Sequence, residues 1–214
     1  MKAIRFNKQQ LEAYKNGATM FIVPIVHPCE YYSSRDQQAI RIEPENDSWY
    51  KEKNYCIREE GGGWQDFTKE DFLDYVKAPL MIGDEFFIQE EFKYIGCKAK
   101  NSPMSNFSRI AYYDHANYNN LGLATGKANI MDASQMTQEK SRYKDVCLNI
   151  EVKVIDNIET KEFKALGYVD VQKKPYSTLN RFNKDHGFTF QDNKYVILYT
   201  IEGIDKWLHK TKNT

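Results

Sequence analysis

The sequence of 214 residues predicts an α+β fold in a single domain. About six segments have the apolar or alternating pattern of β-strands. Short amphipathic segments with helix-capping residues are interspersed among them. Short helices among many strands are typical of the α+β class, and a chain of this length suits one sizeable core with insertions.

The charges are balanced, because 30 basic and 30 acidic side chains give a formal net charge of zero. A neutral chain has no overall attraction for nucleic acid or for an anionic membrane, so any nucleic-acid site must be a local patch. The 15 Tyr, 12 Phe and 3 Trp residues fit the packing of a β-rich fold, with a surface for base stacking as the alternative.

Metal binding and secretion are not indicated. The four cysteines (Cys29, Cys56, Cys97 and Cys147) form no C-x-x-C pair, and His27 with Cys29 supplies only two ligands. We therefore expect no metal and no cofactor. The sequence contains no recognisable signal peptide and no apolar run of about 18 residues, so we expect reduced thiols, a cytoplasmic location and no membrane partner.

The N-terminal elements are clearly marked. Residues 3–6 form a short strand, after which Asn7 caps a helix with Gln10 at the capping-box position. Leu11 and Tyr14 should face the core, and Gly17 ends the helix. The next strand, 20–26, is apolar on both faces, so both should be covered, and Pro24 predicts an edge strand, a bulge or a strand end.

Two long polar ranges, about 30–78 and 96–134, are predicted as insertions. The first contains possible strands at 39–43 and 54–58, a flexible turn at Gly61–Gly63, and a helix that starts at Thr68 and stops before Pro79. The second is broken by a strand at 109–113. The remaining predicted elements are a Gly83-Asp84 turn, strands at 85–92, 146–155 and 194–204, and short helices at 160–166 and 176–183.

The order of these signals resembles the ASCH-domain proteins of phages and prophages, which belong to the PUA-like superfamily. The segments that carry the resemblance are PLMIGDEFFIQEEF (79–92), MTQEKSR (136–142), TKEFKALGY (160–168) and the last strand. Family members typically have P-G-D-x-L-W-V-R-E-x-W, M-P-x-x-A-S-R before a strand, and a helix ending in Glu-Gly. The resemblance implies one domain over 1–214, a PUA-like mixed, partly closed β-barrel with short peripheral helices and long loop insertions, in the cytoplasm of a bacterial host.

Some family positions are kept and others are lost. Gly83-Asp84, Glu90, Met136, Ser141 and Arg142 match the family motifs, whereas Gln89 replaces an Arg and Phe92 replaces a Trp. The family motif G-R-K-T-x-T-R-R-x-I-K-P aligns between Gly17 and Pro28. Its Lys, two Thr and two Arg then fall on Thr19, Met20, Ile22, Val23 and Pro24.

The losses argue against inherited enzyme chemistry. A small branch of the superfamily hydrolyses an acylated cytidine, which implies a Lys, a Thr and a Glu acting together. Those positions hold Thr19, Ile22 and Leu166 or Gly167, so we expect no catalytic residues. Asp114-His115 is a possible acid or base in a surface loop. Glu90 and Glu91 are adjacent on the predicted strand and should point to opposite faces, which excludes a carboxylate pair.

Recognition is the function that remains, and PUA-like domains resemble modules that bind RNA or a modified base. The candidate binding residues are Thr19, Gln89, Glu90, Phe92, Lys140, Ser141 and Arg142. Gln89 and Glu90 could read base edges, Phe92 could stack or lie in the core, and Ser141 with Arg142 could bind a phosphate or a base. Lys140, Arg142 and Lys144 form a basic cluster, or simply a solvated entry to a strand.

A buried Glu90 would need a partner, and Arg142 is the one that we expect, although the pair could be purely structural. Three hypotheses follow. The first is a non-catalytic module for RNA, DNA or a modified nucleotide. The second is a protein-interaction factor of phage type on the same scaffold. The third is a nucleobase or nucleoside amidohydrolase-like enzyme with a rearranged site.

Overall fold

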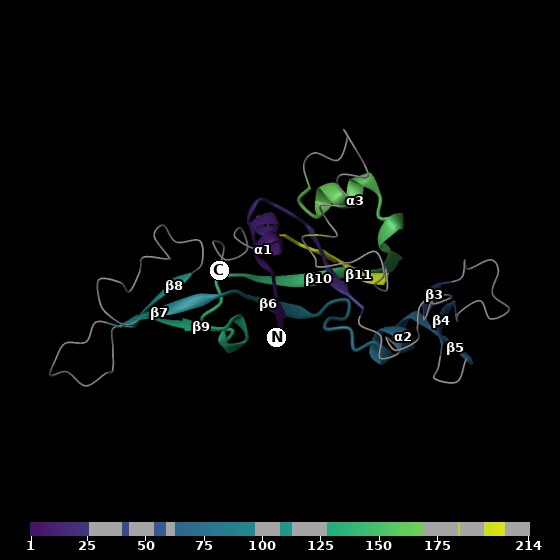
Figure 1. Cartoon of the computed structure of the whole chain (residues 1–214), viewed down its shortest axis with the longest axis horizontal. Coiled ribbons are helices and arrows are strands. Elements are labelled where there is room, and N and C mark those ends of the chain that lie inside the picture. Colours follow the sequence, from purple (N-terminus) through teal and green to yellow (C-terminus); the bar gives the residue numbers. More distant parts are fainter. Residues whose placement is uncertain are drawn as a thin grey trace.

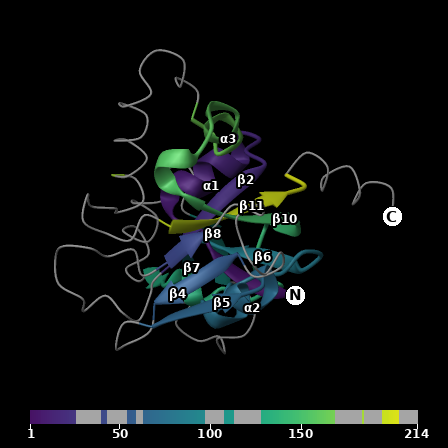
Figure 2. The same cartoon turned by 90° about the vertical axis from the view of Figure 1, so that its right-hand side faces the viewer.

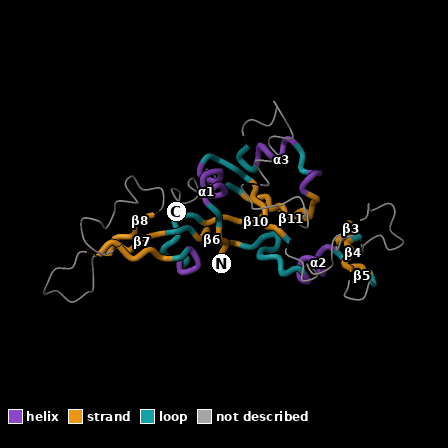
Figure 3. Tube along the Cα trace, viewed as in Figure 1, coloured by secondary structure: helices purple, strands orange, loops and turns teal. Residues whose placement is uncertain are grey.

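The computed structural model describes residues 1–25, 40–42, 54–58, 63–96, 108–112, 128–168, 184 and 195–203. Their elements are mixed α and β, which confirms the predicted class (Figures 1 and 3). The strands are β1 (Lys2–Arg5), β2 (Met20–Pro24), β3 (Ile40–Ile42), β4 (Tyr55–Arg58), β5 (Trp64–Phe67), β6 (Glu85–Gln89), β7 (Phe92–Gly96), β8 (Ser108–Tyr112), β9 (Ala128–Met131), β10 (Lys144–Val154) and β11 (Tyr195–Ile201). The helices are α1 (Lys8–Lys15), α2 (Lys69–Tyr75) and α3 (Thr160–Ala165), with 3-10 turns η1 (Ala133–Gln135) and η2 (Ile155–Asn157).

The described strands form three sheets. The central sheet has the order β1-β6-β10-β11-β2, and two antiparallel sheets have the orders β3-β4-β5 and β8-β7-β9. The two smaller sheets lie at opposite ends of the long axis of the molecule (Figure 1). The central sheet is open, with β1 and β2 at its ends, and the described strands form no closed barrel.

Strand β10 organises the central sheet. Its first residues, Lys144–Val146, pair antiparallel with β6, and from Cys147 to Val154 it pairs antiparallel with β11. The register shifts between Cys147 and Asn149, which is the signature of a bulge. Such an irregularity bends a strand, so β10 can leave one neighbour and join the other.

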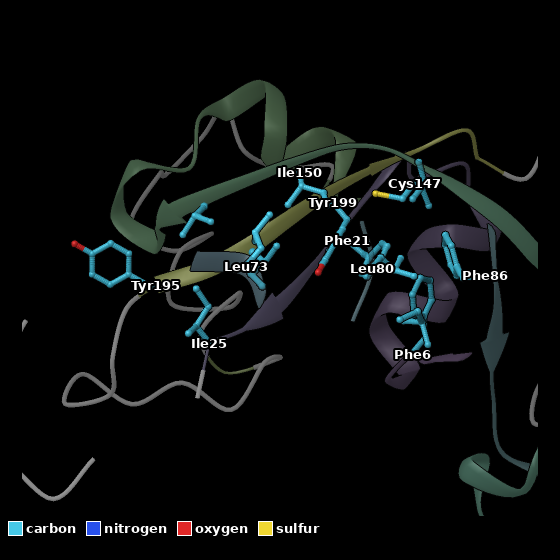
Figure 4. Packing of buried hydrophobic residues seen from close by; sticks show 14 of the residues in the cluster. Phe6, Phe21, Ile25, Leu73, Leu80, Phe86, Cys147, Ile150, Tyr195 and Tyr199 are labelled. Atoms are coloured by element: carbon cyan, nitrogen blue, oxygen red, sulfur yellow. The ribbon is translucent and has the colours of Figure 1, made fainter. Parts of the chain in front are cut away.

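Strand β2 lies at one end of this sheet and is covered on both faces, as its continuous apolar sequence predicts. Phe21 belongs to the main core, where its ring stacks on that of Tyr199 at 4.9 Å between centroids (Figure 4). The next residue, Ile22, belongs to a second cluster that it forms with α3 and β11. Pro24 is the last residue of this end strand, where a missing N–H costs no ladder hydrogen bond.

Helix ends follow the predicted capping chemistry. Asn7 and Gln10 form a complete capping box at α1, and Leu11 and Tyr14 are its buried residues. The Thr68 side chain accepts from the Asp71 N–H at the start of α2. Helices α1 and α3 lie close together, whereas α2 lies away from both (Figure 2).

Two helices are also tied to strand backbones by their side chains. The Gln10 amide of α1 donates to the Ile22 carbonyl at 2.8 Å, and the Lys69 ammonium of α2 donates to the Ile150 carbonyl. These bonds place a helix against β2 and another against β10.

The first predicted insertion, 30–78, is not peripheral where it is described. Ile40, Ile57, Phe72 and Leu73 are buried in the main core, because strands β3 and β4 and helix α2 each present an apolar side to it. The predicted strands at 39–43 and 54–58 are present as β3 and β4, and strand β5 was not predicted.

The second predicted insertion, 96–134, contains the expected strand as β8 and a further strand, β9, that was not predicted. The predicted strand at 85–92 is in fact two strands, β6 and β7, with Glu90 and Glu91 between them. Predictions for His27, Cys29, Cys97, Asp114-His115, Gly61-Gly62 and the helix at 176–183 lie outside the described residues.

None of the helices in the described ranges combines the length and the apolar character that a bilayer crossing requires.

Gly167 and Gly17 provide a matched test of the packing of α3 on α1. Both have positive φ, +91° and +89°, but a Cβ on Gly167 would lie 2.6 Å from the Ala13 Cβ, whereas one on Gly17 meets nothing within 4 Å. We expect Gly17→Ala to lower the free energy of unfolding by about 1 kcal/mol, because only the positive φ is unfavourable for alanine. Gly167→Ala should lower it by about 3 kcal/mol, because the clash with Ala13 adds to the backbone strain. Urea unfolding measures both. Equal losses would show that the two helices do not pack as described.

Candidate functional site

The site is built around a buried carboxylate. Glu90 follows β6 directly, and only 1% of its surface is exposed. A lone charge there would be costly. The Arg142 Nε donates to Glu90 Oε1 at 2.9 Å, and Nη2 donates to Oε2 at 2.5 Å. The expected pair is confirmed, and its two parallel bonds give it a defined geometry.

The location of Glu90 corrects the sequence argument about Glu90 and Glu91. They lie in the link between two strands, not on one strand. Glu90 is buried and Glu91 is exposed, so the two carboxylates still occupy different environments. The pair of acids that the sequence argument excluded is not formed, but the reason is the link and not strand alternation.

Two tyrosines lie against the Arg142 guanidinium. Its central carbon is 4.0 Å from the ring centre of Tyr112 and 5.0 Å from that of Tyr143. Both distances are within the range of cation–π attraction. We call Glu90, Tyr112, Arg142 and Tyr143 the Arg142 cluster. The Arg142 side chain is 24% exposed, so the cluster reaches the surface.

The Tyr112 hydroxyl links the Arg142 cluster to the basic segment. It donates to the Lys140 carbonyl at 2.7 Å. Burial raises the pKa of Tyr112, Arg142 opposes this and Glu90 adds to it, with a net increase. The phenol is therefore neutral at physiological pH. Lys140 and Lys144 are half-buried and lie on either side of Arg142 in sequence.

Two predicted ligand contacts are instead hydrogen-bonded within the chain. The Ser141 Oγ lies 2.8 Å from the Ile88 carbonyl and 2.9 Å from the Tyr143 carbonyl, and its single proton serves one at a time. The Gln89 amide nitrogen lies 3.3 Å from the Met136 carbonyl. Both side chains hold the segment before β10 against β6, which is a structural role.

Phe92 and Thr19 are also placed differently from the ligand-binding hypothesis. Phe92 is fully buried, so its ring cannot stack on an external base, and the core alternative is the one observed. Thr19 is exposed, and its backbone joins α3 to β11: its N–H donates to the Ala165 carbonyl, and its carbonyl accepts from the Ile201 N–H. Among the described contacts, none joins Thr19 to the Arg142 cluster.

A second buried carboxylate, Asp145, was missed by the sequence analysis. It accepts the Tyr14 hydroxyl at 3.0 Å and the N–H groups of Val146, Glu202 and Gly203 at 2.7, 3.0 and 3.1 Å. Burial raises its pKa, and these four hydrogen bonds oppose the increase only in part. The available signal was an acidic residue beside the alternating apolar positions of β10, where a buried acid requires several donors.

The two carboxylate sites are neighbours. The Tyr14 ring contacts the Tyr143 ring edge-on, with centroids 5.7 Å apart. Tyr14 donates to Asp145, and Tyr143 lies against Arg142. The Arg142 cluster therefore has a rigid aromatic and hydrogen-bonded support on the side of α1.

A third buried acid, Glu162, supports α3 and is not part of this site. It forms an ion pair with Lys153 of β10 and accepts the Glu159 N–H at 2.7 Å. Burial would lower the pKa of Lys153, but the hydrogen bonds to Glu162 and Glu151 outweigh it and raise the pKa. A lysine held in its charged form is a structural cation and not a nucleophile.

The amidohydrolase positions form no constellation. Ile22 and Leu166 are buried in the second apolar cluster, and Thr19 is exposed. Among the described residues no group of three potential metal ligands is found. Cys56 and Cys147 are buried, and burial raises the pKa of the Cys147 thiol to about 11, so that thiol is protonated at neutral pH.

Comparisons with models of known protein families, with curated proteins and with solved structures find no match for this chain.

The buried ion pair predicts an asymmetric effect of mutation. We expect Arg142→Ala to cost about 3 kcal/mol of unfolding free energy, because it leaves Glu90 buried without its guanidinium. The double variant Glu90→Gln/Arg142→Ala should be closer to the parent, because the charge is removed as well. Arg5→Ala, which breaks the exposed pair with Asp132, is the control and should have little effect. Urea unfolding of the three variants measures these differences. A small loss of unfolding free energy in Arg142→Ala would contradict the burial of Glu90.

The variant Tyr14→Phe tests the role of the hydrogen bond to Asp145, because its effect on stability should depend on pH. The Tyr14 hydrogen bond favours charged Asp145, so we expect its loss to cost about 2 kcal/mol where Asp145 is ionised. The folded pKa of Asp145 lies above the unfolded value. The contribution of Asp145 itself is therefore present below the unfolded pKa and lost as pH rises through the folded pKa. The difference in unfolding free energy between the parent and Tyr14→Phe should have the opposite pH dependence. It should become smaller as the pH falls, because protonated Asp145 gains less from the Tyr14 hydrogen bond. Urea unfolding from pH 4 to 8 measures it, and a pH-independent difference would exclude this role.

Proposed function

We propose that the protein is a non-catalytic binding module for a nucleic acid or a modified nucleotide, on an ASCH or PUA-like scaffold of phage or prophage type. The observation that carries the proposal is the Arg142 cluster. A guanidinium is fixed by a buried carboxylate, lies against two tyrosine rings, and reaches the surface between two lysines in sequence.

The scaffold proposal is supported by where the matched family residues lie. Glu90 and Arg142 are 52 residues apart in the chain and are bonded to each other. Ser141 bonds to the strand that precedes Glu90, and Gly83, in the matched Gly-Asp turn, has φ of +86°. Motif residues that meet in space are expected when the motifs belong to one conserved framework. On this scaffold the protein would act in the cytoplasm of a bacterial host.

The ligand class is supported by the chemistry of the Arg142 cluster. Arginine and tyrosine side chains stack on nucleobases, and lysine and arginine bind phosphate oxygens. Most contacts to a nucleic acid are to its backbone, so a compact group of cations beside aromatic rings is sufficient for binding without base selection. A neutral net charge is compatible with this, because three of the cations, Lys140, Arg142 and Lys144, lie within five residues of one another in the sequence.

The non-catalytic part of the proposal is supported by the amidohydrolase positions. Two of the three are apolar and buried, and the third is an exposed threonine whose backbone joins two elements. None of the Glu90, Asp145 and Glu162 carboxylates is exposed enough to act on a substrate, because each is at most 3% exposed. Binding is therefore the activity that this arrangement serves best.

The test is a binding screen by fluorescence anisotropy with single-stranded DNA, RNA, duplex DNA and a panel of modified nucleosides, each at low and at high salt. We expect binding to at least one ligand that weakens with salt if it is a polymer. The variant Lys140→Ala/Lys144→Ala should weaken polymer binding about tenfold and reduce the salt slope, whereas Lys161→Ala/Lys164→Ala on α3 should not.

Absence of binding to every ligand at both salt concentrations would overturn the proposal. That result would favour the protein-interaction hypothesis on the same scaffold. Equal losses in the two lysine variants would show that binding does not involve the segment around Arg142.

A further inference from the structure

The central sheet has an outer face that lies away from the main core. The register of β1, β6 and β10 places Ala3, Phe87 and Lys144 side by side, so their side chains share one face. The neighbouring residue Phe86 points to the opposite face and belongs to the main core. Phe87 is buried but belongs to neither apolar cluster. The face of Ala3, Phe87 and Lys144 is therefore a separate surface, which we call the outer face.

One end of the outer face is covered by the segment that contains η1. Arg5 and Gln89 are partners in the β1–β6 register and lie on the outer face, because they are two positions beyond the pair described above. The Gln89 amide nitrogen lies 3.3 Å from the Met136 carbonyl, and the Arg5 guanidinium forms an ion pair with Asp132. The segment 132–136 is therefore held over this end of the sheet.

The other end of the outer face carries exposed apolar side chains. Strand alternation places Met1 on this face with Ala3, and Val146 and Leu148 with Lys144. Met1 is 47% exposed, Leu148 is 44% exposed and Val146 is half-buried. Because β1 and β10 both flank β6, Met1 and Leu148 are only two strand spacings apart across the sheet, ~10 Å.

The turn before β6 adds a further apolar side chain. Ile82 precedes Gly83, which has φ of +86°, and 61% of its surface is exposed. The Gly83 N–H donates to the Cys147 carbonyl at 2.8 Å, which holds the turn beside Leu148. Three of the five large apolar side chains that are exposed in the described part of the chain are thus gathered here. Such a group indicates an interaction site more strongly than scattered apolar residues do. We call this group the outer patch: Met1, Ile82, Val146 and Leu148.

Two opposite charges border the outer patch. Glu85 is exposed and lies opposite Val146, and Lys144 is half-buried and lies opposite Phe87. Within the described residues, neither charged side chain takes part in an ion pair or a hydrogen bond. An apolar patch with an acid and a base at its border is complementary to itself. A two-fold axis that passes between Glu85 and Lys144 brings each of them beside the opposite charge of a second copy.

We propose that the outer patch is the interface of a two-fold symmetric dimer, in which a second copy of this chain packs the same sheet face against it. The apolar side chains then lie at the centre, and Glu85 of each chain faces Lys144 of the other. The inference does not rest on the proposed function, because no nucleic acid takes part in it. The patch is small, so we expect a dimer that dissociates on dilution.

Analytical ultracentrifugation of the full-length protein without nucleic acid, from low micromolar to submillimolar concentration, measures the Kd of the dimer. We expect Ile82→Gln/Leu148→Gln to raise this Kd at least tenfold, because two apolar side chains of each chain are no longer available for burial. The control is Trp64→Gln, since Trp64 is 40% exposed but lies on β5 in another sheet. Its Kd should equal that of the parent.

Charge reversal tests the symmetry of the dimer. Glu85→Lys and Lys144→Glu should each raise the Kd at least tenfold, because like charges then face each other across the axis. An equimolar mixture of these two variants should associate again, since each chain of the mixed dimer meets opposite charges. The double variant Glu85→Lys/Lys144→Glu should dimerise like the parent. The matched controls are Glu12→Lys on α1 and Lys164→Glu on α3, both at exposed positions.

Neutral variants keep the test valid if charge reversal disturbs folding. Glu85→Gln and Lys144→Gln should weaken association in the same direction to a smaller extent. Circular dichroism and thermal unfolding show which variants are folded, and only folded variants are compared.

Each outcome supports or overturns the inference. A parent that stays monomeric at every concentration overturns it, and so does a dimer that the patch variants leave unchanged or that the controls weaken equally. Assemblies larger than a dimer would also overturn it, because a two-fold interface closes after two copies. Failure of the mixture and of the double reversal to associate would exclude the two-fold arrangement. Weakening by single reversals with recovery in the mixture supports it. These outcomes leave the proposed function untouched, because no ligand is present.

Discussion

The carboxylate of Asp145 is buried at the point where β10 changes its neighbour, and the body of the structure depends on the hydrogen bonds that it accepts. The donors come from α1, from β10 itself and from the residues directly after β11. An acid in this position can be tolerated only if its oxygens are satisfied, because an unpaired buried charge costs far more than one hydrogen bond returns. The four bonds therefore fix three distant parts of the chain relative to one another.

Glu90 is also a buried acid, but its carboxylate is satisfied by a different kind of donor, and this difference has a functional consequence. Asp145 is satisfied by neutral donors, so its site is closed and structural. Glu90 is satisfied by a guanidinium that is itself partly exposed, so a cation is held at the surface with little freedom to move. A fixed cation loses less conformational entropy when it binds a ligand than a flexible one does. The tyrosines beside it add flat apolar surface to the same position.

The distribution of charge matters more here than its total. In the sequence, residues 92–131 contain five basic residues and one acidic residue, whereas the rest of the chain contains 25 basic and 29 acidic residues. The bonds of Ser141 and Gln89 hold the segment before β10 against β6, and the bond of Tyr112 ties the same segment to β8. Ser141 and Gln89, which the sequence suggested as ligand contacts, are therefore used to join this segment to β6.

Local signals in the sequence determined most of the elements. Helix α1 is specified by its Asn7 and Gln10 capping box, and α3 is followed by Gly167, because caps and positive-φ positions depend on a few neighbouring residues. The same local logic predicted a strand at 20–26, observed as Met20–Pro24, and its coverage on both faces. The Glu90–Arg142 pair is an exception, because it joins residues 52 apart and was predicted from the need of a buried acid for a cation among the residues that match the family motifs.

Only the tertiary structure decided how the elements are combined and which polar side chains are occupied. The break between β6 and β7, the core role of residues in 30–78, the burial of Phe92 and the donors of Asp145 all depend on contacts between residues far apart in the chain. A sequence pattern reports which residues must be buried or capped, since those needs are local. It does not report which distant group meets each need, because that is fixed only when the sheet has its strand order and register.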